Sequence, residues 1–185
     1  MIMNITLYGA ASNAVDDIYK IRVYELGQEM ALRGHTMVYG AGGGGLMGAA
    51  AQGLYDHGGK IIGITPHFMH DVEPIYEKCT ELIDTETMSE RKDLMENMAD
   101  AFVIVPGGIG TFDEFFQALT LKKLGRHNKP IILYNVNGFW DNMLAVVGAD
   151  MFKGFIANDI GTYFNVCETA QTTVDTIERL VNKKA

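Results

Sequence analysis

This sequence has few of the residues that cross-link a chain, and no run that would insert it into a bilayer. Its 185 residues include two cysteines, Cys79 and Cys167, which form no CxxC pair, so we expect no disulfide framework. No apolar run approaches the roughly 20 residues of a membrane span. The N-terminus lacks a basic region followed by a cleavage site, so no signal peptide is expected. These absences predict a cytoplasmic protein.

Positive charge is also scarce, with 15 lysines and arginines against 23 aspartates and glutamates and a formal net charge of -8. Such an acidic chain argues against a nucleic-acid polymer or an anionic membrane as partner. A local pocket for one phosphate stays compatible with this charge. Hydrophobic residues make up 48% of the sequence, which is enough for a sizeable core in one domain spanning residues 1–185.

Short apolar runs alternate with helical patterns along the whole chain. Strands are expected at about residues 1–8, 36–39, 60–65, 79–84, 101–105, 130–135 and 163–167, and helices at about 15–32, 46–57, 86–98, 112–124, 138–147 and 168–181. This alternation predicts an α/β fold with a doubly wound, mostly parallel, Rossmann-like sheet. No repeat or linker divides the chain.

The stretch from Val103 to Phe116 is the most informative part of the sequence. A buried strand ends at Pro106, and three glycines follow that let a ligand approach the main chain. Those glycines are Gly107, Gly108 and Gly110. Thr111 is expected to cap the next helix, with Glu114 as its capping-box partner. The free N–H groups and positive dipole end at this helix start predict an anion site, most naturally for a phosphate.

Two more loops of small residues follow strands, at residues 9–13 and 40–45. Because the carboxyl ends of parallel strands share one edge of a sheet, all three loops are expected to lie together, where such folds bind ligands. The sequence has no GxxxxGK[ST] motif, and its first loop is not GxGxxG. A P-loop and a dinucleotide fingerprint are therefore not expected.

Charged residues open the helix expected near residue 86, and two of them are cations. Such a run is usually a solvated face. However, Arg91 and Lys92 lie near the positive end of the helix dipole, which disfavours cations. An anion or a carboxylate facing them explains their position better.

The motif Met88-x-x-Arg91-Lys92, followed by Pro106-Gly-Gly-x-Gly-Thr-x-x-Glu114, resembles the signature pair of the LOG (LONELY GUY) family of cytokinin riboside 5'-monophosphate phosphoribohydrolases. The second glycine loop, with Gly42 and Gly45, is similar to another family motif. The resemblance covers most of the chain. It implies a nucleotide-monophosphate-binding domain that hydrolyses the N-glycosidic bond of an AMP-like or cytokinin-like monophosphate. It also implies a homodimer with sites near the subunit boundary, and no cofactor is expected.

The resemblance also implies a role for each matching residue. Glu114 corresponds to the catalytic glutamate and Arg91 to the catalytic arginine. A carboxylate can stabilise the oxocarbenium-like state, hold ribose hydroxyls or orient water. Arg91 stays charged, so it would steady the departing purine or position Glu114, with Lys92 adding to either role. The expected substrate-binding residues are Lys92, Gly107, Gly108, Ile109, Gly110, Thr111, Gly42, Gly45, Met88 and Ser12.

The first loop departs from the family pattern, because Ala10 and Ala11 stand where members commonly have serines. Ser12 or Asn13 can substitute for the lost hydroxyls. This departure leaves a second hypothesis open, a non-catalytic carrier of a nucleotide or the molybdenum cofactor, as in similar carrier proteins. A third alternative is a structural protein without phosphate binding. His67 and His70 share a loop with Asp71 and Glu73, but their spacing favours a solvated loop over a metal site.

Overall fold

The computed structural model describes residues 1–148, 154–156 and 159–183. Its centre is a seven-stranded sheet in the order β4-β3-β2-β1-β5-β6-β7, in which every neighbouring pair is parallel. The strands are β1 Asn4–Tyr8, β2 Thr36–Tyr39, β3 Lys60–Pro66, β4 Glu81–Thr85, β5 Ala101–Ile104, β6 Ile131–Tyr134 and β7 Asn165–Cys167. The helices are α1 Asp17–Leu32, α2 Gly45–Asp56, α3 Met88–Met98, α4 Ile109–Lys123, α5 Asp141–Val147 and α6 Ala170–Asn182. The predicted α/β fold is confirmed.

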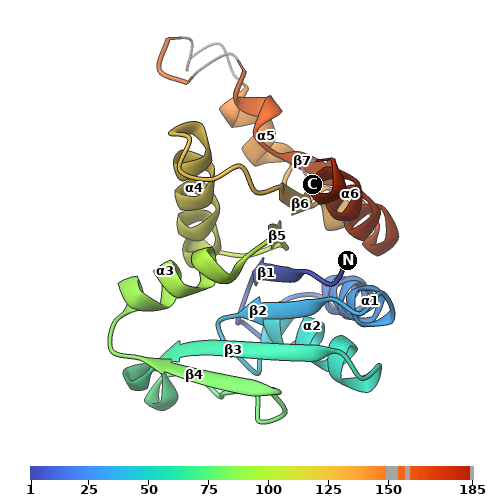
Figure 1. Cartoon of the computed structure of the whole chain (residues 1–185), viewed down its shortest axis with the longest axis vertical. Coiled ribbons are helices and arrows are strands. Elements are labelled where there is room, and N and C mark those ends of the chain that lie inside the picture. Colours follow the sequence, from blue (N-terminus) through green and yellow to red (C-terminus); the bar gives the residue numbers. More distant parts are fainter. Residues whose placement is uncertain (149–153, 157–158, 184–185) are drawn as a thin grey trace.

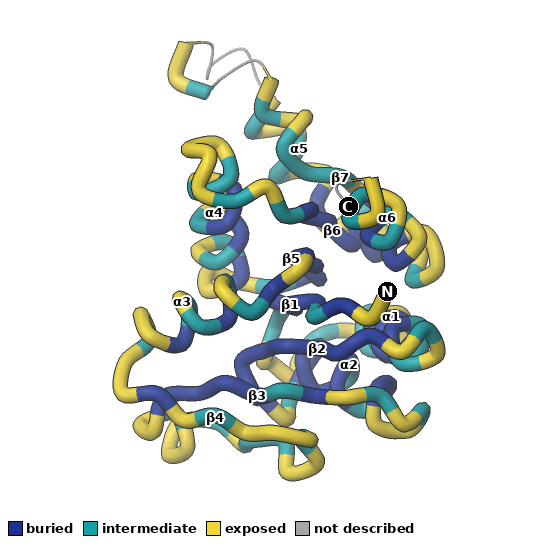
Figure 2. Tube along the Cα trace, in the orientation of Figure 1, coloured by how far each residue is buried: buried dark blue, intermediate teal, exposed yellow. Residues whose placement is uncertain are grey.

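Helices cover both faces of the sheet (Figure 1), because successive strand residues point to opposite sides. In β5, Val103 joins one core cluster with residues of α1, α2 and α6, while Phe102 joins the other with residues of α3 and α4. The central strands are buried along their length (Figure 2). Within the described residues, no helix has the length and apolar character needed to cross a membrane.

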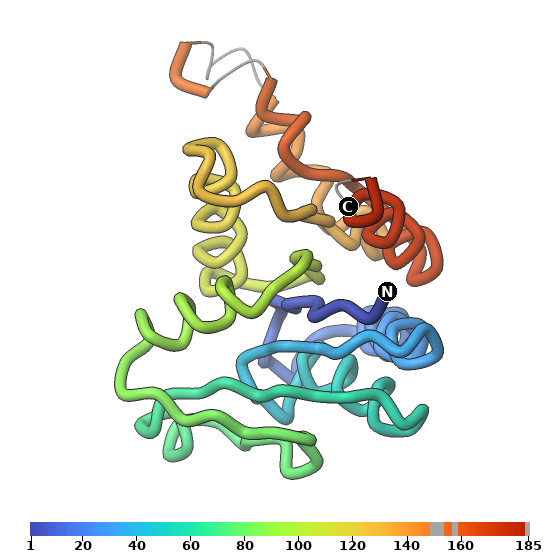
Figure 3. Tube along the Cα trace, viewed as in Figure 1, coloured from blue at the N-terminus to red at the C-terminus, as the bar shows by residue number. Residues whose placement is uncertain are grey.

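The site lies where the chain reverses its direction across the sheet. From β1 the chain runs outward through β2 and β3 to β4, and then returns to β5 on the other side of β1 (Figure 3). Ligands of doubly wound sheets bind at the carboxyl ends of strands at such a switch point. Backbone hydrogen bonds join all three predicted loops there. The Ala10 N–H donates to the Pro106 carbonyl at 3.1 Å, and the Ala10 carbonyl accepts from the Leu46 N–H at 2.8 Å.

The predicted start of α4 is wrong by three residues. Gly108, in an extended conformation, is the N-cap, and α4 begins at Ile109. Thr111 is the third residue inside the helix, so the predicted Thr111–Glu114 capping box does not form. Thr111 is buried and instead packs over Gly107, where an added Cβ would overlap the Thr111 hydroxyl. The glycine lets the helix begin one turn early.

Candidate active site

Arg91 and Glu114, 23 positions apart in sequence, meet at the switch point. The Nη2 of Arg91 lies 3.7 Å from Oε1 of Glu114, and both side chains are nearly buried, with 10% and 12% of their surface exposed. Arg91 comes from the first turn of α3, whose start is fixed by a capping box between Thr87 and Glu90. The solvated-face interpretation of this run is therefore wrong for Arg91, which faces a carboxylate as the dipole argument predicted.

The guanidinium of Arg91 is fixed by the surrounding main chain. Its Nε donates to the Ile64 carbonyl at 3.2 Å, and its Nη1 lies 3.0 Å from the Met88 sulfur. The backbone of Gly40 closes the remaining side, where an added Cβ would overlap Nη2 of Arg91. Arg91 is thus held in one place before any ligand arrives, while Met88 acts on the arginine and is outside the residues that line the cavity.

Burial raises the pKa of Glu114 from its ordinary value of 4.5 to about 7, although the charge of Arg91 lowers it. The neighbouring Asp113 raises this pKa further, and Lys92 lowers it. A carboxyl that titrates near neutral pH suits proton transfer.

Lys92 faces a different carboxylate. Its Nζ lies 2.8 Å from Oδ2 of Asp113, a half-exposed residue beside Glu114. Lys92 is not among the residues that line the cavity. The structure therefore connects Lys92 to Glu114 through Asp113, and its predicted contact with substrate stays a prediction.

The start of α4 supplies backbone donors. The N–H groups of Ile109, Gly110 and Thr111 lie in its first turn, where an α-helix has no acceptor of its own, while Phe112 N–H already bonds to the Gly108 carbonyl. Gly108 and Gly110 have open space where a Cβ would stand. This geometry fits the predicted phosphate cradle.

A cavity of about 340 Å³ joins these donors to the carboxylates. Five stretches of chain line it, and together they bring six of the twelve predicted site residues to one place. The lining residues are Gly9, Ala10, Ala11, Ser12, Met47, Met69, Glu73, Arg91, Gly108, Gly110, Thr111 and Glu114. Ser12 is exposed at the rim, and its hydroxyl accepts from the Ala14 N–H at 3.2 Å.

The second glycine loop packs against the first loop, and its predicted contact with substrate stays a prediction. The start of α2 is already filled by protein acceptors, because Gly45 N–H donates to Oδ1 of Asn13 at 2.8 Å and Leu46 N–H to the Ala10 carbonyl. Gly45 has a left-handed φ of 56° and a Cβ there would crowd the first loop. Gly42 and Gly45 are outside the set of cavity-lining residues. This loop supports the site from behind.

Sequence reasoning missed Glu73. The structure corrects the view of its loop as merely solvated, since Glu73 is half-buried and lines the cavity with Arg91 and Glu114. Burial raises the pKa of Glu73, and the charge of Arg91 lowers it. The histidines of this loop point elsewhere, with His70 Nε2 2.7 Å from Asp84. No motif marks Glu73, because only the fold of the loop after β3 brings it back to the site.

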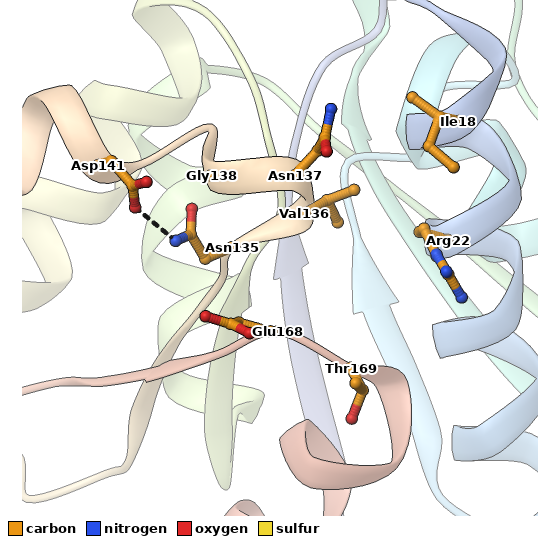
Figure 4. Close-up of a pocket in the computed structure, with 9 residues that line it drawn as sticks. All are labelled: Ile18, Arg22, Asn135, Val136, Asn137, Gly138, Asp141, Glu168 and Thr169. Carbon is orange, nitrogen blue, oxygen red and sulfur yellow. Dashed lines mark hydrogen bonds between the residues drawn. The ribbon is translucent and has the colours of Figure 1, made fainter.

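A larger cavity, of about 460 Å³, opens between α1 and the ends of β6 and β7 (Figure 4). Several of its polar side chains are already paired with protein. The amide of Asn135 donates to Asp141 at 2.8 Å, and Arg22 pairs with Glu25 at 2.9 Å. It holds none of the predicted site residues, so its size does not make it the candidate site.

Comparisons with known proteins agree with this geometry. A family model described as "Possible lysine decarboxylase" matches residues 47–177. The cytokinin riboside 5'-monophosphate phosphoribohydrolase LOG of Oryza sativa subsp. japonica is 36% identical over 177 residues, covering 96% of this chain and 73% of that protein. The cytokinin riboside 5'-monophosphate phosphoribohydrolase LOG2 of Arabidopsis thaliana is 32% identical over 179 residues, covering 97% of this chain and 84% of that protein.

Solved structures share the fold at lower identity. The Moco carrier protein from Chlamydomonas reinhardtii aligns with a TM-score of 0.73 and 21% identity, covering 99% of both chains. The molybdenum cofactor binding protein from Rippkaea orientalis aligns with a TM-score of 0.72 and 20% identity, covering 97% of this chain and 96% of that one. At these identities the likeness concerns the fold alone.

Proposed function

This chain belongs to the LOG family, and we propose on that basis that it hydrolyses the N-glycosidic bond of a purine riboside 5'-monophosphate, AMP-like or cytokinin-like, to free base and ribose 5-phosphate. The observation that carries the proposal is the convergence of Arg91 and Glu114, 3.7 Å apart, on a cavity that opens at the first turn of α4. A phosphate site and a titratable carboxyl in one cavity match the two ends of such a substrate.

In this proposal the 5'-phosphate binds the free N–H groups of Ile109, Gly110 and Thr111. The helix dipole favours the dianion at that point. A phosphate anchored there directs the sugar into the cavity toward Glu114, three to five residues further along the same helix. Gly107 lets the helix begin early and Gly108 keeps its first turn open, so both support the phosphate site through the backbone, and their own contact with substrate remains a prediction.

Glu114 in its ionised form stabilises the positive charge that develops on the sugar as the C1'–N bond breaks. Water adds to C1' and gives its proton to Glu114, while the bonding electrons leave with the purine, which takes up a proton. Arg91 stays a cation throughout and donates hydrogen bonds to the departing base or to Glu114. Nothing in this sequence of steps needs a cofactor.

The proposal also includes a homodimer in the cytoplasm, with neither a nucleic-acid polymer nor a membrane as partner. The side chain of Ile109 is 88% exposed at the start of α4, and Phe116 on the same helix is 39% exposed. An apolar surface this close to the cavity suits a subunit contact beside the site.

A product assay tests the function. Incubation with AMP and a panel of purine and pyrimidine monophosphates is expected to release free base and ribose 5-phosphate in equal amounts from at least one purine substrate. Adenosine, which lacks the phosphate, is expected to react poorly and serves as the control. Tight nucleotide binding without turnover on any member of the panel would instead support the carrier hypothesis.

The pH dependence tests the protonation state of Glu114. Because its pKa is about 7 in the free protein, kcat/KM is expected to rise with pH through about 7 and level off above it. Asp113→Asn removes a charge that raises this pKa, so the midpoint of the profile is expected to move to lower pH. A rate that falls as pH rises through 7 would contradict the proposal, since the protonated acid would then be the active form.

A further inference from the structure

We infer that Glu73 is a second carboxylate of the substrate site, which binds the ribose hydroxyls and makes the enzyme select ribonucleotides over 2'-deoxyribonucleotides. This inference rests on the proposed function and assigns a specificity-determining residue that the motifs do not contain.

The position of Glu73 is the first support. It lines the same 340 Å³ cavity as Arg91 and Glu114. The two carboxylates enter from opposite sides of β1, because Glu73 follows β3 and Glu114 follows β5. A sugar anchored by its phosphate on α4 would lie between them.

The lack of a protein partner is the second support. Within residues 1–148, 154–156 and 159–183, the structure gives the Glu73 carboxylate neither a hydrogen bond nor an ion pair, although the side chain is half-buried. A carboxylate withdrawn from water without donors is unfavourable. Two vicinal sugar hydroxyls supply two O–H donors to its two oxygens, and acidic side chains bind ribose in this way in other nucleotide folds.

The support beneath Glu73 is the third. The segment that carries it is tied to the second glycine loop, where Gly43 N–H donates to the Pro74 carbonyl at 2.8 Å and Tyr76 N–H to the Ala41 carbonyl at 2.9 Å. Gly42 forms an antiparallel bridge with Ile75, and a Cβ on Gly42 would stand 3.5 Å from Oε1 of Glu73. The second glycine loop therefore fixes the backbone that carries Glu73 at the edge of the cavity. Because Gly42 has no side chain, space remains beside the Glu73 carboxylate.

The carboxylates of Glu73 and Glu114 and the guanidinium of Arg91 then have different roles. Glu114 is the deeper acid and lies on α4, the helix that holds the phosphate, with Arg91 beside it. Glu73 is more exposed and has no competing hydrogen bond, so it is free to accept from the 2'- and 3'-hydroxyls. Discrimination by one sugar hydroxyl is expected from such a contact, because a hydrogen bond to a charged group contributes strongly to binding.

The test compares AMP with 2'-deoxy-AMP in the full-length protein. Glu73→Gln and Glu73→Ala are expected to lower kcat/KM for AMP by about 10- to 100-fold. The loss for 2'-deoxy-AMP is expected to be at least about 3-fold smaller, because that substrate keeps only the 3'-hydroxyl as a partner for Glu73. The control is Glu77→Gln, an exposed glutamate of the same loop outside the cavity, which is expected to leave both values unchanged. The greater intrinsic lability of deoxyribosides cancels, because the ratio is compared between variants.

Equal losses on both substrates, or no loss on either, would overturn the inference. Dissociation constants of AMP and 2'-deoxy-AMP separate this outcome from a failure of the proposed function. If the wild-type protein binds nucleotides without turnover, the hydrolase proposal fails, while a preference for AMP that Glu73→Gln abolishes still supports the role of Glu73. If it binds neither nucleotide, both proposals fail.

Discussion

Glu114→Gln is expected to lower kcat by about 10²- to 10⁴-fold, the range associated with losing a positioned acid–base group. Glutamine keeps the shape of the side chain, but it can neither accept a proton from water nor stabilise positive charge on the sugar. Because the proposed phosphate contacts lie at Ile109, Gly110 and Thr111, away from the substituted side chain, the dissociation constant for AMP is expected to stay within a few-fold. The measurement is single-turnover release of adenine, with calorimetry for binding.

The same substitution is expected to stabilise the protein. Higher stability would exclude unfolding as the cause of the lower activity. The pKa of Glu114 is about 7 when folded and 4.5 ordinarily, so the folded state holds the proton more tightly. Stability therefore falls as pH rises from about 4.5 to 7, and the full cost is present above 7. Removing the buried carboxylate charge is therefore expected to raise the free energy of unfolding above pH 7 by roughly 3 kcal/mol.

Denaturant unfolding at two pH values checks this second effect. At pH 8 Glu114→Gln is expected to unfold at higher denaturant than wild type, and at pH 4 the two proteins are expected to unfold alike. A variant that is less stable at pH 8 would mean that the ionised Glu114 supports the fold. The lower activity of Glu114→Gln could then not be assigned to the chemical step.

Gly40→Ala is expected to lower kcat/KM by at least about 100-fold and to lower the free energy of unfolding by roughly 1–3 kcal/mol. A Cβ on Gly40 would overlap the end of the Arg91 side chain, which has to move away and give up its hydrogen bond to the Ile64 carbonyl. Arg91 would then leave its place beside Glu114. A displacement of about 1 Å in a catalytic group suffices for a loss of this size.

Gly161→Ala is the matched control, since an added Cβ there meets nothing within 4 Å. It is expected to keep full activity. The displaced arginine also predicts that the pKa of Glu114 rises further, so the pH midpoint of Gly40→Ala is expected to move upward. Full activity in Gly40→Ala would mean that the fixed position of Arg91 is unimportant.

Much of the fold could be predicted, because the sequence alternates without ambiguity. Buried strands such as β5 are short apolar runs that end at glycine or proline, and each is followed by a segment with helical periodicity. Arg91 and Glu114 were also found from sequence, the former because a cation at the start of a helix needs an anion nearby. The structure gives that anion as Glu114, at 3.7 Å.

The errors came from packing contacts, one within the loop before α4 and one between segments distant in sequence. Thr111 has the chemistry of an N-cap, but its packing over Gly107 moves the helix start to Ile109. Glu73 lies in an irregular loop with charges of both signs, and only its backbone pairing with the second glycine loop turns it inward. Local propensity contains no information about either contact.

The cavity is assembled from stretches near residues 10, 47, 73, 91 and 110, which meet only after β5 has inserted beside β1. No fragment ending before Ala101 can contain both Arg91 and Glu114 in place, so a newly synthesised chain acquires its ligand site late. Contacts this distant in sequence are slow to form. Nucleotide affinity therefore reports completion of the whole central sheet, and a bound monophosphate would stabilise that finished state by mass action against every partly folded one.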